Sequence, residues 1–181
     1  MAETDNNRRQ LLTAGALGAA AGVGALLSGC APRAGAPATA AASPAAAGLP
    51  RERYEQYVQW FNENDPRFLE FYHPDVVLEL GAATLEGANA IRDFYAEVKA
   101  HIKETVTVNH YVSDATGVGV EIPTEFKVYK DWPEPNYFKR PLKAGEVMRV
   151  ISFGLYWMEG GKFRRIKAAR YKLVNEWKME G

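Results

Sequence analysis

The chain has 181 residues, enough for one domain of ordinary size together with a tail. Its 22 lysines and arginines balance its 22 aspartates and glutamates, so the formal net charge is zero and no strongly basic face is imposed for nucleic-acid binding. Cys30 is the single cysteine, which excludes an intramolecular disulfide and a zinc cage built on cysteines.

The N-terminal segment has the order of parts that is typical of a bacterial export signal. The paired arginines Arg8 and Arg9 resemble a twin-arginine signal, and a mildly apolar run follows over residues 11–27. This run is rich in glycine and alanine, so it is weaker than a membrane-spanning helix needs. Residues 27–30, Leu-Ser-Gly-Cys, resemble the lipobox of bacterial lipoproteins, in which the cysteine is lipidated and cleavage leaves it first.

These features divide the chain into three parts. We expect residues 1–30 to be a signal peptide that ends at Cys30, and residues 31–48 to be a flexible Ala/Pro-rich tether. Charged, aromatic and β-branched residues first occur together in residues 49–181, which we expect to form one folded domain. The sequence therefore predicts an exported, membrane-anchored lipoprotein of the periplasm. The alternatives are a simple membrane anchor and secretion after cleavage at an Ala-x-Ala site.

The domain is expected to begin with helices. Residues 50–64 have the spacing of one buried helical face, formed by Tyr54, Tyr57, Val58 and Phe61. Asp65 precedes a proline, which predicts a capped second helix over about 66–72.

The next segment is expected to contain a short strand and a third helix. Residues 73–75, His-Pro-Asp, predict a turn, and residues 76–80 predict a strand by their β-branched content. Residues 81–87 predict a loop or hairpin, and residues 88–103 predict the third helix.

The remainder is expected to be strands. Residues 105–112 alternate, with Val106, Val108, His110 and Val112 on one face. Further strands are expected over 116–130, bent at Pro123, over 146–157 and over 163–174. A polar, proline-rich loop over 131–143 and a hairpin turn over 159–162 connect them. Helices followed by antiparallel strands predict a sheet that curls over the helices to bury one face.

This order and several short motifs resemble the nuclear transport factor 2-like superfamily, in particular its SnoaL-like branch. The motifs are Tyr57-Val58 with Asn62 and Asp65, His73-Pro74-Asp75-Val76-Val77, Leu85-Glu86-Gly87 with Ala90-Ile91-Arg92-Asp93-Phe94-Tyr95, and Gly161-Lys162-Phe163-Arg164-Arg165-Ile166. The resemblance covers about residues 51–173. It implies an α+β fold, a cone-shaped barrel of a strongly curved antiparallel sheet wrapped over three N-terminal helices. It also implies a cavity inside the cone and a homodimer formed through the outer sheet face.

Tyr57 and His110 are the candidate catalytic residues. Tyr57 falls where ketosteroid isomerases of this superfamily have their oxyanion-hole tyrosine, and a phenol in an apolar pocket can donate to a developing oxyanion. The alternative is a core tyrosine whose hydroxyl is satisfied. The position of the carboxylate base in these isomerases corresponds to Leu80 in this sequence, and the position of their second oxyanion donor lies near Phe153. Neither residue can fill the role, so steroid isomerisation is not predicted.

His110 lies on the apolar face of its expected strand, where dehydratases of this superfamily place a general acid/base. An imidazole titrates close to neutral pH and so suits this role. The alternative is a histidine bonded to a backbone carbonyl or to a carboxylate. The aspartate that pairs with the dehydratase histidine has no clear counterpart, because the first helix offers only Glu52 and Glu55.

Other residues are candidates for binding a ligand. Arg149 can bind an anionic group, or pair with Glu79 or Glu121. The expected pocket residues are Arg149, Glu79, Trp60, Phe94, Phe153 and Tyr171. The aromatic loop over 131–140 is a candidate lid, and a dimer mate is the alternative cover for its three large aromatic side chains.

The sequence predicts no cofactor and no metal. Its three histidines lack the spacing of a metal site, and no phosphate-binding glycine loop is present. We expect a pocket for a small, apolar, oxygenated ligand, with lyase or isomerase chemistry of the dehydratase or cyclase kind. The alternative is a non-catalytic ligand-binding or protein-interaction module tethered in the periplasm.

Overall fold

The computed structural model describes residues 48–81 and 83–180. The predictions of a signal peptide, a lipidated Cys30 and a tether fall outside these residues. Within the described part of the chain, no helix is both long enough and apolar enough to cross a bilayer.

Three helical segments precede or interrupt the sheet: α1 (Arg51–Asn62), the 3-10 helix η2 (Pro66–Phe71) and α2 (Ala88–Lys99). The four residues predicted for the buried face of α1 are all buried. The predicted cap of η2 is confirmed, because the Asp65 carboxylate accepts a hydrogen bond from the backbone N–H of Arg67 at 2.9 Å. Helix α2 ends four residues earlier than predicted, since Ile102 already begins a strand.

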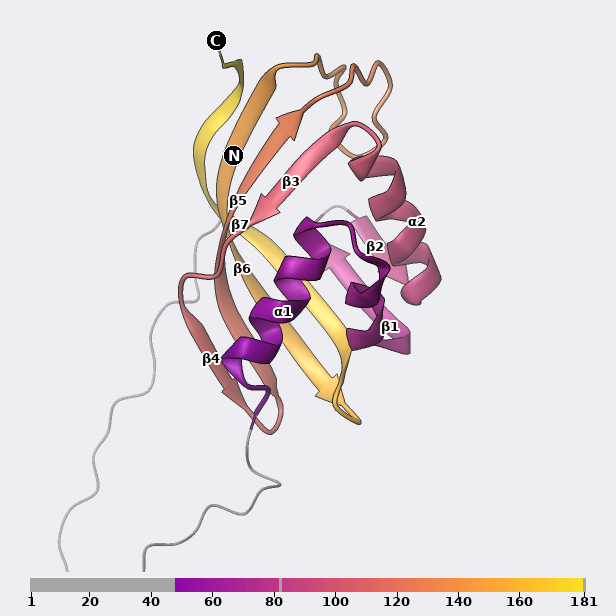
Figure 1. Cartoon of the computed structure of the whole chain (residues 1–181), viewed down its shortest axis with the longest axis vertical. Coiled ribbons are helices and arrows are strands. Elements are labelled where there is room, and N and C mark those ends of the chain that lie inside the picture. The colour runs from indigo at the N-terminus through magenta and orange to yellow at the C-terminus, as the bar shows by residue number, and fades with distance from the viewer. Residues whose placement is uncertain (1–47, 82, 181) are drawn as a thin grey trace, which may run out of the picture. The chain divides into compact units, whose positions relative to one another are not determined.

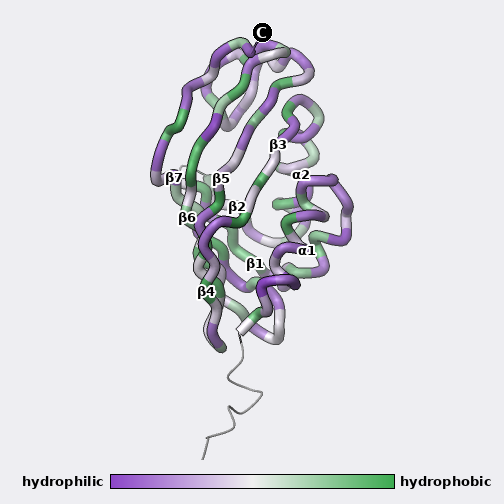
Figure 2. The backbone as a smooth tube through the Cα atoms, turned by 60° about the vertical axis from the view of Figure 1, so that its left-hand side comes forward, coloured by the Kyte–Doolittle hydropathy of each residue, from purple (hydrophilic) through white to green (hydrophobic). Residues whose placement is uncertain are grey.

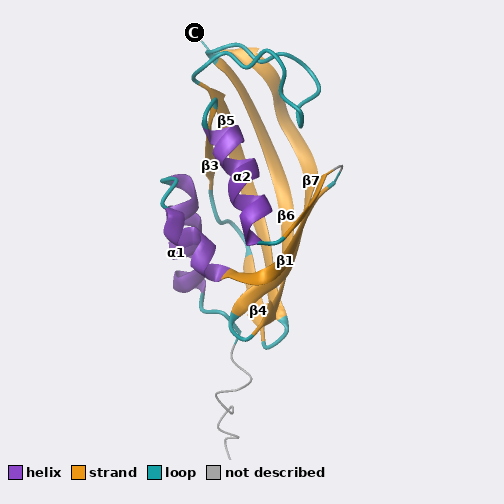
Figure 3. Ribbon diagram, turned by 90° about the vertical axis from the view of Figure 1, so that its right-hand side faces the viewer, coloured by secondary structure: helices purple, strands orange, loops and turns teal. Residues whose placement is uncertain are grey.

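Seven strands form one sheet: β1 (Tyr72–Leu80), β2 (Ala83–Glu86), β3 (Ile102–Val106), β4 (Tyr111–Asp114), β5 (Gly117–Val128), β6 (Glu146–Glu159) and β7 (Lys162–Met179). The strand order is β2-β1-β7-β6-β5-β3, and β4 pairs with the same edge of β5 as β3 does. All pairings are antiparallel except that of β1 with β7, which is parallel. The long strands curve, and α1 and α2 lie on the concave side (Figures 1 and 3). The predicted α+β cone is confirmed.

Several strand boundaries differ from the prediction. The predicted turn at His73-Pro74-Asp75 is part of β1, which begins at Tyr72. Strand β5 continues through Pro123, whose carbonyl still accepts a hydrogen bond from the backbone N–H of Thr107 at 2.9 Å. The predicted hairpin turn is present, with positive φ at both Gly160 and Gly161.

The single alternating strand predicted over 105–112 is wrong. Val106 lies opposite Thr124, whereas Tyr111 lies opposite Val120, so the segment holds one residue more than the strand that it faces. Such a bulge reverses which side chains face the core. After it, the Tyr111 ring packs inward with its centroid 5.4 Å from that of Tyr54, and Val112 is 70% exposed on the outer face.

Hydrophobic and hydrophilic residues alternate along the strands, as Figure 2 shows by colour, so one face of the sheet packs on the helices. A second, smaller core lies beneath the loop between β5 and β6. Trp132 of this loop is buried there, beside the partly buried ring of Phe138. The loop aromatics are therefore covered largely by the chain itself, and a dimer mate is not needed to cover them.

Candidate functional site

A cavity of about 870 Å³ lies between the helices and the concave face of the sheet. Pockets for drug-sized ligands commonly have volumes of about 300 to 1,000 Å³. The deep end of the cavity is lined by the buried tyrosines Tyr54, Tyr57, Tyr72 and Tyr156. The exposed side chains of Arg140, Arg170 and Glu176 also line the cavity, and this solvent-exposed rim is here called the mouth. Most of the remaining wall is aliphatic or aromatic, so a ligand would lie in an environment that is largely apolar.

Glu104 places a carboxyl group in this wall. It lies on β3 opposite Phe126 of β5, and it forms no hydrogen bond or ion pair with any described residue. Burial raises the pKa of Glu104 to about 7, and the positive charge of Lys99 opposes that rise. A carboxyl group that titrates near neutral pH and has no structural partner can accept a proton from a ligand and return it.

Lys99, at the end of α2, adjusts the protonation of Glu104 from outside the cavity. Its Nζ donates a hydrogen bond to the backbone carbonyl of Phe61 and lies 3.7 Å from the centroid of the Phe61 ring. Burial lowers the pKa of Lys99 to about 8, and the negative charge of Glu104 opposes that change. Lys99 and Glu104 also line a second hollow of about 460 Å³, here called the outer hollow, next to the ends of α1 and α2. The ammonium group therefore favours the ionised carboxylate without occupying the cavity.

Two tyrosine hydroxyl groups line the same cavity as Glu104. The hydroxyl oxygens of Tyr57 and Tyr72 lie 2.9 Å apart, and burial raises the pKa of both phenols, so both stay protonated at neutral pH. Whichever hydroxyl accepts this hydrogen bond keeps its own proton free for a ligand. The charge of Glu104 also contributes to the raised pKa of Tyr57, of Tyr95 and of Tyr137, so its field reaches several phenols of the cavity wall. Tyr57 thus lies in the cavity as predicted, with its hydroxyl also hydrogen-bonded, as the alternative reading expected.

His110 does not lie in the cavity, which corrects its expected position. Its side chain is exposed, and its backbone carbonyl accepts a hydrogen bond from Glu121 N at 3.0 Å. The bulge after Val106 is the physical reason, because it ends the alternation on which the prediction rested. Sequence reasoning missed Glu104, although Glu104 precedes Val106 by two residues and so shares its face. Counting the alternation from Ile102 would have found it.

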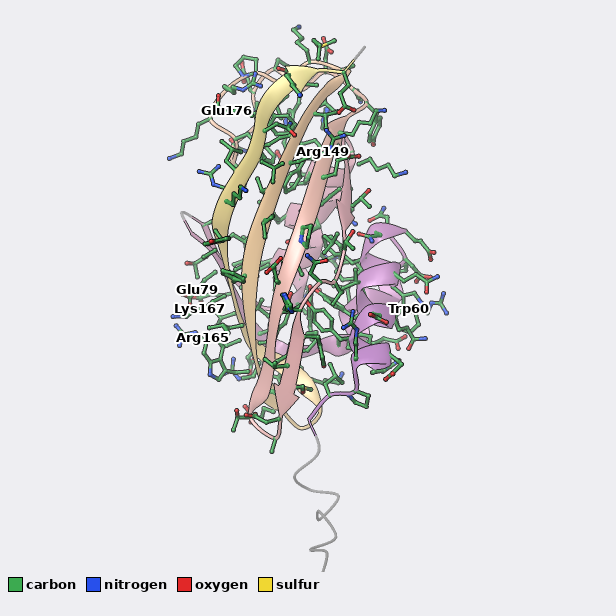
Figure 4. The ribbon with its side chains drawn as sticks, turned by 90° about the vertical axis from the view of Figure 1, so that its left-hand side faces the viewer. Trp60, Glu79, Arg149, Arg165, Lys167 and Glu176 are labelled. Carbon is green, nitrogen blue, oxygen red and sulfur yellow. The ribbon has the colours of Figure 1, made fainter. Side chains whose placement is uncertain are left out.

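Of the predicted pocket residues, Phe94 lines the cavity. Trp60 lies outside it on α1, with the guanidinium carbons of Arg53 and Arg67 at 5.7 and 4.6 Å from its ring centroid. Glu79 faces the other side of β1, where it pairs with Arg165 at 2.5 Å and Lys167 at 3.4 Å. These three side chains lie together in Figure 4, away from Trp60. Neighbouring residues of a strand face opposite sides of the sheet, and it is Leu80 that lines the cavity.

Arg149, Phe153 and Tyr171 also lie outside the cavity. Arg149 pairs with Glu125 at 2.6 Å and Glu180 at 2.5 Å, rather than with Glu79 or Glu121. The rings of Phe153 and Tyr171 pack against each other on the outer face with centroids 4.9 Å apart, and they are 44% and 67% exposed. These residues therefore belong to the outer surface of the sheet.

Residues 54–166 match the family model described as the SnoaL-like domain. Among solved structures, the chain is similar to a candidate polyketide cyclase from Pseudomonas putida KT2440, with a TM-score of 0.55 and 16% identity over 64% of this chain and 86% of that one. It is also similar to an LEH-like epoxide hydrolase from M. tuberculosis, with a TM-score of 0.53 and 11% identity over 65% of this chain and 78% of that one. No curated protein sequence matches the chain.

The identities to the solved structures are low, so these likenesses show a common fold and nothing more. The family model, by contrast, covers more than half of the chain, from α1 into β7. Together with the curved sheet and its cavity, this match shows that the chain belongs to the SnoaL-like domain family.

Proposed function

We propose that the domain is a cofactor-independent lyase or isomerase in which Glu104 moves a proton on a small, largely apolar, oxygenated molecule. One observation carries this proposal. Glu104 is an ionisable side chain in an apolar cavity wall, it has no partner among the described residues, and burial raises its pKa to about 7. Structures of the same fold described as a candidate polyketide cyclase and an epoxide hydrolase support small-molecule chemistry in this kind of cavity.

The chemistry follows from the groups in the wall. The Glu104 carboxylate takes a proton from a carbon next to a carbonyl group, and the C–H electron pair moves toward the carbonyl oxygen. The free hydroxyl proton of the Tyr57–Tyr72 pair donates a hydrogen bond to that oxygen as its negative charge develops. If a double bond is conjugated with the resulting enolate, the protonated Glu104 returns the proton to the far carbon of that double bond as the carbonyl re-forms, which is isomerisation. If the next carbon carries a hydroxyl group, the re-forming carbonyl expels it, and the proton from Glu104 converts it to water, which leaves a double bond.

Proton abstraction can be tested without the natural substrate. Wild-type full chain incubated in D₂O with the bicyclic ketone 1-tetralone is expected to accelerate deuterium incorporation next to the carbonyl, followed by NMR. Glu104→Gln should lower this rate by about 100- to 10,000-fold, since the amide cannot accept the proton. Glu121→Gln is the matched control, because it makes the same change on β5 where Glu121 faces away from the cavity toward Asn109. Equal exchange by wild type and Glu104→Gln would refute the proposal.

The second candidate function is a ligand-binding module without chemistry. The mutual hydrogen bond of Tyr57 and Tyr72 favours it, since one of the two hydroxyl protons is already used inside the protein. A ketone that raises the melting temperature of wild type and Glu104→Gln equally, with no deuterium exchange in either, would support this function over the enzymatic one.

We also propose that the chain is exported and anchored to the membrane through a lipid on Cys30. The support is the order of the twin arginines, the apolar run and the lipobox-like sequence in residues 8–30. In a bacterial host, the chain should fractionate with membranes, and mass spectrometry of its N-terminal peptide should find a lipid on Cys30. Cys30→Ser should then appear in the soluble fraction, and a Cys30 peptide without lipid would contradict the proposal.

A homodimer through the outer sheet face is proposed as well. Several large apolar side chains are exposed there, which is unusual for a surface that stays uncovered; they include Val112, Phe153, Leu155, Trp157 and Tyr171. Sedimentation of the full chain is the test, and Leu155→Glu is expected to convert the dimer to a monomer.

A further inference from the structure

The mouth of the cavity carries an arginine that the proposed chemistry does not use. Arg170 lies on β7 opposite Ser152, and Lys172 lies opposite Ile151, so Tyr171 is an extra residue in this pairing. Arg170 follows Ile166 and Ala168 along the side of β7 that lines the cavity, whereas Tyr171 packs against Phe153 on the outer face. Strand alternation thus places this side chain at the mouth.

Arg170 differs from the other arginines in the part of the chain that the structure describes. Each of the others donates a hydrogen bond to a side chain or to a backbone carbonyl: Arg51, Arg53, Arg67, Arg92, Arg140, Arg149, Arg164 and Arg165. Arg170 has no hydrogen bond or ion pair with a described residue. Its five N–H donors are therefore free to bind a ligand, and the guanidinium stays charged at any physiological pH.

The charge of Arg170 affects the pKa of a residue that lines the cavity. Tyr137 lines the wall, and its pKa is raised by burial first and by Glu104 second, while Arg170 lowers it. One phenol thus lies within range of both charges. The cavity accordingly has an acidic group on β3 and a basic group at the mouth, with apolar wall between them.

We infer that the mouth binds a carboxylate group of the ligand through Arg170, so the ligand is an apolar molecule with a carboxylate at one end. A guanidinium matches a planar carboxylate with two parallel N–H···O bonds. Glu176 also lines the mouth, but it lies six residues farther along β7 and forms no ion pair with Arg170, so it does not occupy this guanidinium. The inference rests on the proposed function only for the reacting end of the molecule, since recognition of the carboxylate is a binding property.

A matched pair of probes tests this inference by isothermal titration calorimetry on the full chain. The probes are 6-phenylhexanoate and its neutral amide, 6-phenylhexanamide, which differ only at the end expected to meet Arg170. Wild type should bind the carboxylate about tenfold more tightly than the amide, as expected for a charge-assisted pair at a partly solvated site. Arg170→Gln should bind both probes alike, and Arg170→Lys should keep part of the preference.

Two control variants separate recognition by Arg170 from a general effect of charge. Arg165→Gln removes an arginine from the outer face of the same strand and should leave the preference unchanged. Glu176→Gln removes the charge of another exposed residue that lines the cavity and should leave the preference nearly unchanged.

A preference that survives in Arg170→Gln would overturn the inference, and so would a wild type that binds the two probes equally or binds neither. This binding test needs no turnover. Its failure would therefore leave the role of Glu104 standing, and failure of the deuterium-exchange test would leave the carboxylate site standing.

Discussion

Replacing Lys99 by methionine tests the electrostatic reasoning about Glu104. The substitution keeps an unbranched side chain of similar length and removes the positive charge that opposes the rise in the pKa of Glu104. Because proton abstraction requires the ionised carboxylate, activity is present above the pKa of Glu104 and is lost as the pH falls through it. A higher pKa in Lys99→Met should therefore move the acidic limb of the rate–pH profile to higher pH.

The size of this displacement follows from the separation of the two charges. At an effective dielectric constant of about 20, two unit charges 4 Å apart interact by about 4 kcal/mol. Lys99 and Glu104 form no direct ion pair in the described structure, and Lys99 is partly exposed. The interaction should thus be nearer 1 to 2 kcal/mol, which corresponds to about one pH unit.

The assay is deuterium exchange of 1-tetralone between pH 5 and pH 9, with wild type, Lys99→Met and Lys103→Met. Lys103 is an exposed lysine on β3 that lines the outer hollow, so it controls for a general loss of positive charge. The limb should move for Lys99→Met and stay close to the wild-type position for Lys103→Met, with equal rates for all three proteins at pH 9. A limb that does not move, or that moves to lower pH, would refute the electrostatic reasoning.

Further predictions concern stability and the deep end of the cavity. Because the pKa of Glu104 is raised from 4.5 to about 7 in the folded state, ionisation opposes folding, and the loss of stability develops as the pH rises through this range. Urea unfolding should therefore find Glu104→Gln more stable than wild type by about 3 kcal/mol at pH 8 but similar at pH 4, and a gap that is the same at both pH values would contradict this. Tyr57→Phe should lower deuterium exchange by about 10- to 100-fold without abolishing it, since Tyr72 remains as a donor, and an unchanged rate would exclude the hydroxyl pair as an oxyanion donor. Asp65→Ala should lower the free energy of unfolding by about 1 kcal/mol through loss of the η2 cap, whereas Asp65→Asn should recover most of it; equal stability of all three proteins would show that the cap is not stabilising.

The sequence by itself determined the architecture. Helical spacing identified the buried face of α1, the Asp65-Pro66 pair identified the start of η2, and two consecutive glycines identified the β6–β7 turn. These signals are local, because capping, helical periodicity and positive φ depend on residues close together in the chain. The same alternation along β1 places Glu79 on the opposite face from Leu80, so this expected pocket residue lies outside the cavity.

Only the tertiary structure decided which side chains meet in the cavity. An extra residue in a strand pairing reverses the facing of every residue that follows, and neither the bulge before Tyr111 nor the one at Tyr171 has a clear local mark in the sequence. The first bulge places His110 outside the cavity, and the second brings Leu173, rather than Lys172, to the cavity wall. Likewise, the pKa of Glu104 depends on its burial in the folded domain and on the charge of Lys99, which comes from another element, the end of α2. Alternation along one strand predicts a face, but burial and charge at a site come from the packing of elements that are distant in the sequence.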